Sequence, residues 1–316
     1  MTRILRRLAQ SLTVLFAVAT FWFFALSVAP GDYFSEARIN PLTSPKTLQN
    51  LREAYGLSKP LYVRYAKWMV SLAHGDLGES IAYNQPVASL LAPRLRNTLL
   101  LSATSLALAW ALALGLGFWA GATAGGNIDR TLRVVAAILL AVPEIVVAML
   151  LVYWDAKTGW LPTGGMSQSE NSGAWDIARH MVLPVAVLTA TTFPLLFRHV
   201  RVAVRDTLDA PFIRTALAFG IDPLRLVFRY VLPAAANPLF SLVGLSVAVL
   251  LSSSLIVEVV FGWPGLGPMF LDALFARDTY LLLAPMLVSS LLLLAGNLLA
   301  DILLIWNDPR IRAGTD

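Results

Sequence analysis

The sequence contains no cysteine and few charged residues. Without cysteine the chain forms no disulfide and offers no thiolate ligand to a metal. Only 14% of its 316 residues are charged and 57% are hydrophobic. Soluble globular proteins have about 25% charged residues, so this composition excludes an ordinary soluble domain and is typical of a protein that lies in a lipid bilayer.

Catalytic and nucleotide-binding motifs are also missing. None of the lysines follows a glycine, so the chain lacks the Gly-Lys loop that holds the phosphates of ATP. It contains no G-x-S-x-G and no H-E-x-x-H motif, and its histidines are scattered along the sequence. We therefore expect no catalytic residue, no metal site and no cofactor bound by this chain. The lysines are Lys46, Lys59, Lys67 and Lys157, and the histidines are His74, His180 and His199.

Long apolar runs dominate the sequence. Six stretches approach or exceed the roughly 20 apolar residues that a helix needs to cross a bilayer, and we expect one transmembrane helix in each. The stretches are 8–29, 99–121, 134–154, 181–197, 234–257 and 279–305, of which the fourth is the shortest. The first could alternatively be a signal peptide that ends at Ser27-Val28-Ala29, but its length and the following Pro30 favour a retained helix.

Lys and Arg lie mainly in one set of the predicted loops. Of the 24 basic residues, 13 lie at the two termini, between the second and third stretches, or between the fourth and fifth. Because basic loops stay on the cytoplasmic side, we expect both termini in the cytoplasm. The net charge of +5 then reflects membrane topology, and we expect no nucleic-acid partner.

The segment 30–98 between the first two stretches is predicted to form two helices outside the membrane. The first begins after Ser44 and ends at Gly56, and the second runs from Ser58 to His74. The second helix is amphipathic and is expected to lie along the membrane interface. It could cap the outer mouth of the protein or dock an external partner. Its apolar face comprises Leu61, Tyr65, Met69 and Leu72, with Tyr62 and Trp68 beside them.

A polar helical hairpin is predicted between the fourth and fifth stretches. Asp209 is placed to cap its first helix, and Gly220 to end that helix in a left-handed turn. Asp222 then starts a second helix, which we expect Pro233 to interrupt. A short helix pair joined to a membrane span is stiff enough to transmit a push from a soluble partner. The alternative is an ordinary loop that its prolines and glycines shape.

Several ordered motifs resemble one family, the membrane permease subunits of ATP-binding-cassette (ABC) importers of the dipeptide, oligopeptide and nickel group. The resemblance covers nearly the whole chain. Its motifs are YGLSKPLYVRYAKWMVSLAHGDLGES at 55–80, PRLRNTLLLS at 93–102, GWLPTGG at 159–165, Arg214-Thr215-Ala216 followed by Gly220, VEVVFGWPGLG at 257–267 and NDPRIR at 307–312.

The resemblance implies an all-α integral membrane protein with six transmembrane helices, a long external loop after the first and a cytoplasmic coupling helix between the fourth and fifth. Residues 1–98 would hold the first transmembrane helix and the external helices, and residues 99–316 the core permease domain with its coupling hairpin at 205–233. The chain would form half of the translocation pathway for peptides or similar small solutes in a bacterial inner membrane. Nickel chelates, glutathione and sugars are alternative substrates.

The family's partners are two ATP-binding subunits that use ATP and Mg²⁺, a second related permease and an external solute-binding protein. In the family, the hairpin sits in a groove of an ATP-binding subunit. Ala218-Phe219 departs from the small and basic pair that usually precedes the glycine, so Phe219 would form a more apolar anchor. By resemblance, the coupling residues are Arg214, Thr215, Ala216, Phe219, Gly220, Ile221 and Asp222.

Ionisable side chains inside membrane segments are costly and therefore candidates for function. Glu144 follows a proline in the third stretch and either faces the pathway, where it would favour a cationic substrate group, or bonds a neighbouring helix. Glu258 lies just before a Gly- and Pro-rich turn that contains Trp263 and that by resemblance lines the outer gate, although Glu258 could simply cap a helix end. Asn297 and Asp301 share a helix face, where an interhelical hydrogen bond is favoured over substrate contact.

A stripe of small residues, Gly117, Gly121 and Gly125, predicts a close helix contact, for which the partner permease is one candidate.

Two other classes of function fit the sequence less well than a permease. A secondary transporter would carry repeated halves, and the sequence shows no internal repeat. An intramembrane enzyme would need one of the motifs that are missing.

Overall fold

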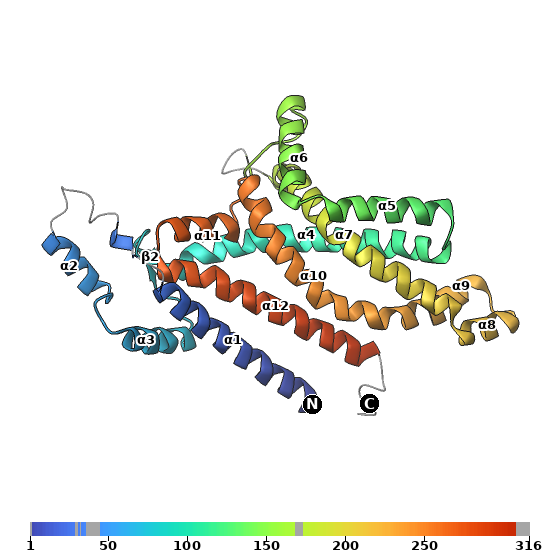
Figure 1. The fold of residues 1–316 in the computed structure, drawn as a ribbon, viewed down its shortest axis with the longest axis horizontal. Coiled ribbons are helices and arrows are strands. Elements are labelled where there is room, and N and C mark those ends of the chain that lie inside the picture. Colours follow the sequence, from blue (N-terminus) through green and yellow to red (C-terminus); the bar gives the residue numbers. More distant parts are fainter. Residues whose placement is uncertain (1, 29–30, 32, 36–44, 168–172, 308–316) are drawn as a thin grey trace. The chain divides into compact units, whose positions relative to one another are not determined.

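The computed structural model describes residues 2–28, 31, 33–35, 45–167 and 173–307, and nearly all of them are helical (Figure 1). The long helices are α1 (Thr2–Val28), α4 (Val87–Ala122), α5 (Asn127–Ala141), α6 (Glu144–Thr158), α7 (Ala174–Asp209), α10 (Leu232–Val260) and α12 (Thr279–Asn307). The shorter helices are α2 (Pro45–Ala54), α3 (Leu61–Ala73), α8 (Pro211–Ala218), α9 (Pro223–Leu226) and α11 (Leu266–Phe275), with a 3-10 turn at Tyr33–Ser35 and a π turn at Val227–Val231. The strands β1 (Glu79–Ser80) and β2 (Gln85–Pro86) pair antiparallel, with Glu79 opposite Pro86.

Five of the six predicted membrane stretches form single long helices: α1, α4, α7, α10 and α12. The third stretch does not, because α5 and α6 meet at an angle of 96°. Pro143 lies at the break and has no amide hydrogen to donate, and Val142 before it is extended, with φ −89° and ψ 123°. Figure 1 shows α6 at this sharp angle to α5.

The shortest predicted stretch lies in α7, which is 36 residues long and the most buried of the candidate spans. Within its most apolar window, 67% of the residues are buried, against 11–33% in the other four. A helix that is surrounded by protein needs fewer apolar side chains than one that faces lipid, so buried His180, Thr189 and Thr192 are tolerated along α7. This is why its apolar run appears short in the sequence.

The chain divides into two compact units. The N-terminal unit comprises Met1–Thr98 and Pro264–Leu291, and the core unit comprises Leu99–Trp263 and Leu292–Asp316. Two apolar clusters fill the core unit. One surrounds Phe197 and Val204 of α7, and the other surrounds Leu188 of α7 with Val257 and Trp263.

Close packing of α4 on α7 depends on two glycines of the predicted stripe. A Cβ atom at Gly117 would lie 2.9 Å from the Cβ of Val200, and one at Gly121 would lie 2.8 Å from the carbonyl oxygen of Arg201. The stripe at these positions therefore packs within the chain, which corrects the suggested contact with a second permease. A Cβ at Gly125 would have nothing within 4 Å.

In the N-terminal unit the predicted external helices form α2 and α3. The proposed cap of α2, Ser44, lies outside the described residues. The apolar face of α3 packs against α1: the Tyr65 and Thr20 hydroxyls are hydrogen-bonded at 2.7 Å, and Trp68 stacks on Phe23 with ring centroids 5.2 Å apart. The alternation of apolar and polar positions in α3 thus reflects burial of one face on α1.

Candidate functional site

A hairpin of α8 and α9 follows directly from α7, at the end opposite to α6 (Figure 1). Ala210, with φ −66° and ψ 143°, separates α7 from α8, and Pro211 occupies the first helical position of α8. The prediction that Asp209 caps α8 is wrong, because the extended residue falls one position later. Asp209 is the last residue of α7, where its carboxylate lies 3.9 Å from Arg205.

Gly220 makes the turn of the hairpin, as predicted. Its φ of +73° is left-handed, a conformation that side chains with a Cβ disfavour. The Gly220 amide donates to the Leu217 carbonyl at 2.9 Å, and the Ile221 amide donates to the Ala216 carbonyl at 3.3 Å, which closes the end of α8. Asp222 then starts α9, since its carboxylate accepts the Arg225 amide at 3.2 Å.

The prediction that Pro233 interrupts the second helix is wrong. α9 continues through the π turn Val227–Val231 into α10, and Pro233 lies in the first turn of α10. In the π turn the Leu232 amide donates to the carbonyl of Val227, five residues earlier. This wider turn accommodates Pro233, which has no amide hydrogen, so the helix continues from the hairpin into the membrane span.

The hairpin has a buried base and an exposed outer surface. Ile213, Ala216 and Leu226 belong to the same apolar cluster as Val204 of α7, and half-buried Ile221 packs against it. The outer surface carries exposed apolar and polar side chains, with Phe219 82% exposed. Thus, of the predicted coupling residues, Ala216 and Ile221 lie toward the base, and the others lie outside. The exposed ones are Arg214, Thr215, Phe219, Gly220 and Asp222.

Phe212 and Leu217 add to this exposed surface and did not figure in the prediction. They are 47% and 52% exposed. Phe212 lies in α8 and Phe219 is the residue that caps its C-terminal end; being seven residues apart, or about two helical turns, they project from the same side. The sequence signal that could have revealed them is an aromatic residue repeated at helical spacing in a polar, Arg-bearing segment.

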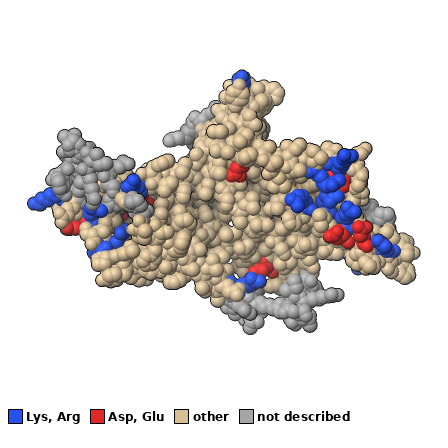
Figure 2. Space-filling view, viewed as in Figure 1, with Lys and Arg blue, Asp and Glu red and all other residues tan. Residues whose placement is uncertain are grey.

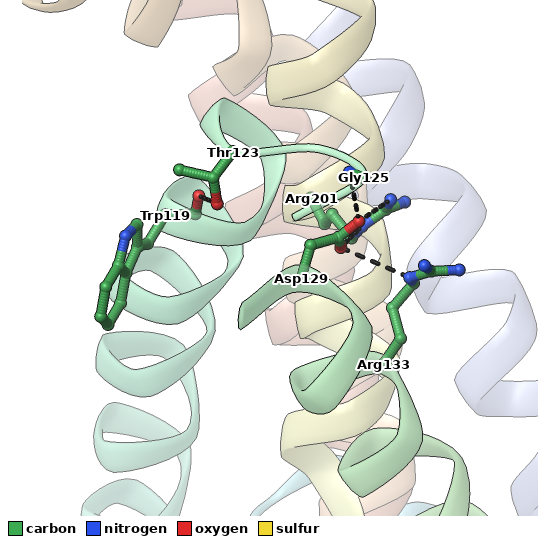
Figure 3. Close-up of polar contacts among 6 residues, drawn as sticks. All are labelled: Trp119, Thr123, Gly125, Asp129, Arg133 and Arg201. Carbon is green, nitrogen blue, oxygen red and sulfur yellow. Dashed lines mark hydrogen bonds and ion pairs between the residues drawn. The ribbon is translucent and has the colours of Figure 1, made fainter. Parts of the chain in front are cut away.

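A buried ion pair holds the start of α5 against α7 (Figure 3). The carboxylate of Asp129 is fully buried and accepts hydrogen bonds from Nε and Nη2 of Arg201, the latter at 2.9 Å, and from the Gly125 amide at 3.0 Å. Nε of Arg133 lies 3.4 Å from the same carboxylate. The turn between α4 and α5 is therefore fixed to the part of α7 that leads to the hairpin. The sequence reading counted these arginines only as markers of topology.

On the face shown in Figure 2, arginine side chains gather at the end of the core unit that carries α8 and α9, while the middle of that unit is largely uncharged. An apolar cleft of about 940 Å³ opens beside the base of the hairpin, between α4, α7, α10 and α12. Trp110, Phe118 and Phe228 are among its walls. It contains no group that could act as an acid, base or nucleophile, and the described residues contain no cluster of three or more potential metal ligands.

The predicted pathway residues lie at separate places. Glu144 occupies the first turn of α6 and is half-buried, and its side chain makes no hydrogen bond or ion pair with any described residue. Glu258 and Trp263 are fully buried at the end of α10, where the Trp263 amide donates to the Glu258 carbonyl at 2.8 Å. The loop 159–165 meets this end, since the Gly165 amide donates to the Phe261 carbonyl at 2.9 Å.

Asn297 and Asp301 lie on α12. The side chain of Asn297 lies so close to Gly244 of α10 that a Cβ at Gly244 would collide with its amide. Gly244 and Glu258 are 14 residues apart on α10, which places the Asn297 contact about 21 Å from the Glu258 turn at 1.5 Å per residue. The structure thus brings Glu258 and Trp263 together, whereas Asn297, on the same helix as Asp301, contacts α10 at a different position along its axis.

Residues 113–313 match the family described as the inner membrane component of binding-protein-dependent transport systems. The chain belongs to this family of transport permeases. Residues 1–102 of the permease match the separate N-terminal region described for such membrane components. It is 34% identical over 311 residues, 98% of each chain, to the oligopeptide transport system permease protein AppB of Bacillus subtilis. It is 31% identical over 314 residues, 98% of each chain, to the glutathione transport system permease protein GsiC of Escherichia coli.

Among solved structures, the permease is similar to a chain of the inward-facing MetNI methionine ABC transporter. The TM-score is 0.57 at 18% identity, covering 69% of this chain and 96% of the other, which indicates a shared fold. The predicted family, the helical membrane fold and the assignment as an ABC permease are confirmed. The permease is a multi-pass membrane transport component and not an enzyme by itself.

Proposed function

We propose that this permease forms half of the translocation pathway for peptides or similar small solutes, and that ATP-binding subunits drive it through the hairpin of α8 and α9. The single observation that carries the coupling role is the exposed face with Phe212 and Phe219 on a base that is packed into the core of the protein. Neighbouring exposed apolar side chains that are rimmed by polar residues are typical of a protein–protein contact. Peptides are the favoured substrate because the relative with 34% identity is named an oligopeptide permease.

The hairpin is suited to transmit force in both directions. α8 is joined to α7 by one extended residue, Ala210, and α9 runs through the π turn into α10. Ile213 and Leu226 tie both arms to one apolar cluster, so a displacement of the hairpin moves the ends of α7 and α10 together. The ion pair of Asp129 and Arg201 extends this connection to α5.

The complete importer in this proposal has two ATP-binding subunits that use ATP and Mg²⁺, a second related permease and an external solute-binding protein. Both termini of the permease lie in the cytoplasm, on the same side as the hairpin. The position of 13 of the 24 basic residues in the corresponding loops and termini supports this orientation. Closure of the ATP-binding subunits would move the hairpins inward and open the cavity between the two permeases to the outside.

The surroundings of the pathway residues favour a different role for each of them. Glu144 faces the pathway and favours a cationic group of the solute, since its carboxylate is half-buried and has no partner among the described residues. Glu258 and Trp263 stabilise the outer gate, and their complete burial supports a structural role in that turn. Asn297 and Asp301 support helix packing, and Asn297 does so against Gly244.

Glutathione is the second candidate substrate. Its support is the 31% identity to a glutathione permease over 98% of each chain. Uptake assays with radiolabelled peptides and with glutathione in cells that carry the complete transporter distinguish the two. Competition by peptides but not by glutathione supports the first assignment.

The coupling role is tested by Phe219→Ala in the co-expressed complex. Burying a phenylalanine side chain contributes about 1.5–3 kcal/mol, so its loss should weaken attachment of the ATP-binding subunits by roughly 10- to 150-fold. The matched control is Phe275→Ala, because Phe275 is 75% exposed but lies on α11. The measurement is co-purification of the ATP-binding subunits together with solute uptake. If Phe219→Ala keeps both at the level of the control, the hairpin is not the coupling element.

A further inference from the structure

A polar pocket of about 360 Å³ lies in the N-terminal unit, beside α3. Three cationic side chains line it, Lys59, Arg64 and Lys67, together with aromatic walls that include Trp68 and Tyr280. A pocket of this volume is large enough to take a small polar group.

The cations of the pocket are not neutralised by the described part of the chain. None of the three side chains makes a hydrogen bond or an ion pair with any described residue. Nε of Arg64 is buried and has no hydrogen-bond partner there. Buried donors in native proteins are almost always paired, so this one indicates a missing acceptor. Beside two ammonium groups, the acceptor that a guanidinium binds most strongly is an anion.

Two carboxylates also line the pocket, and they set its net charge. Asp76 is engaged locally, because its carboxylate accepts the Gly78 amide at 2.9 Å. Glu79 is exposed, in β1. Three cations and two carboxylates leave a charge of +1, which matches the single negative charge of a phosphodiester. Neither carboxylate lies within 4.0 Å of a cationic nitrogen in the described residues, so the cations remain available.

The position of the pocket relative to the membrane follows from how α3 packs on α1. The contacts of α3 reach Thr20 and Phe23, which precede the end of α1 at Val28 by eight and five residues. At 1.5 Å per residue, these contacts lie about 12 Å and 7.5 Å from the end of the helix. The candidate span ends at Val28, so α3 packs against the last part of the span, and its long cationic side chains reach the headgroup level by extending toward that end.

The exposed side of α3 is also apolar. Tyr62 and Val70 are 71% and 60% exposed, and Ala66 lies between them at helical spacing. Lysine side chains next to such a surface extend their charged ends to the headgroup level while their methylene stems cover apolar surface. The helix therefore offers contacts for an acyl chain directly beside the cationic pocket.

We infer that this pocket binds the headgroup phosphate of an anionic phospholipid in the leaflet that contacts the C-terminal end of α1. Arg64 donates from its Nε and a terminal nitrogen to the phosphate oxygens, in the two-pronged geometry that guanidinium favours. Lys59 and Lys67 add charge at the rim. The acyl chains follow the exposed face of α3, and the bound lipid fixes α3 against α1.

The test is native mass spectrometry of the complete, detergent-purified transporter to which palmitoyl-oleoyl phosphatidylglycerol or phosphatidylcholine is added. The proposal predicts one tightly held phosphatidylglycerol, and at least tenfold weaker retention of it in Arg64→Gln. Arg96→Gln is the matched control, because Arg96 is an exposed arginine of the same unit outside the pocket. It should retain the lipid as the unchanged protein does.

Lys67→Gln provides a second variant that keeps the test decisive if Arg64→Gln fails to fold, since Lys67 is exposed. It should weaken lipid retention severalfold without changing the elution of the complex in gel filtration. Equal retention in Lys67→Gln and Arg96→Gln, or equal retention of phosphatidylcholine, overturns the proposal. Displacement of the lipid by millimolar inorganic phosphate alone assigns the pocket to a free anion and also overturns it. A variant that keeps the lipid but loses the solute-binding protein would show a protein-docking site instead.

Discussion

Removing the charge of Asp129 should destabilise the permease strongly. In Asp129→Asn the guanidinium of Arg201 keeps its position but loses its counter-charge, and the Gly125 amide loses a charged acceptor. Breaking a buried ion pair from one side costs about 3–5 kcal/mol, because the remaining charge is left uncompensated. The side chain of Arg201 is 12% exposed, so water relieves part of this cost and we expect the lower end of the range. At about 2–4 °C for each kcal/mol, the midpoint of thermal unfolding should fall by roughly 6–12 °C.

The assay is fluorescence-detected gel filtration of the co-expressed complex after heating at graded temperatures. Asp206→Asn is the matched control, since Asp206 is an exposed residue of α7 whose side chain makes no hydrogen bond or ion pair with any described residue. A surface change of this kind alters stability by less than about 0.5 kcal/mol. The double variant Asp129→Asn with Arg201→Gln should recover part of the loss, because no uncompensated charge remains. If Asp129→Asn melts with the control, the pair does not hold α5 to α7.

Three further variants probe the packing, the hairpin and the pathway. Gly121→Ala should destabilise the permease by about 1–3 kcal/mol, because the added Cβ clashes with the Arg201 carbonyl. Gly115→Ala, whose Cβ would have nothing within 4 Å, should be neutral or stabilising. Equal melting temperatures of the two variants would contradict the close packing. Gly220→Ala should cost about 1–2 kcal/mol of local stability and speed tryptic cleavage of the hairpin, because position 220 is left-handed. Gly220→Asn should have a smaller effect, since asparagine tolerates this conformation better. Equal cleavage rates for the two variants would argue against the need for a left-handed residue at position 220. Glu144→Gln should lower uptake of lysine-containing peptides and spare neutral ones in transport assays, and unchanged uptake of both removes Glu144 from the pathway.

Much of the fold was predictable because its determinants are local. The apolar runs indicated where membrane helices form, since a helix is the way for one chain segment to satisfy its own backbone in lipid. The apolar face of α3 followed from residues at helical spacing, and the Gly220 turn followed from the one residue type that favours a left-handed conformation. The coupling residues were proposed from family resemblance, and their role stays a prediction.

The remaining features depend on residues that are distant in the sequence. Asp129 and Arg201 are 72 positions apart, and no local pattern distinguishes this arginine from its neighbours that face solvent. Phe219 was noticed beside Gly220, but the exposed face it shares with Phe212 required the orientation of α8 on the core. The pocket beside α3 could not be foreseen either, because Tyr280 of its wall comes from the other end of the chain.

Two prolines separate what the sequence determined from what the tertiary structure decided. Both remove a backbone donor, and from the sequence Pro233 was expected to interrupt its helix. At Pro143 the chain breaks into α5 and α6 at 96°, whereas Pro233 follows a π turn in which buried Val231 is held by the core, and the helix continues. The sequence by itself therefore determined the composition of each membrane segment and where its hydrogen bonding is weak. Only the tertiary packing decided whether the helix breaks or continues at each proline. Where residues distant in the sequence provide contacts that offset the cost of the missing hydrogen bond, the helix continues; where they do not, it breaks.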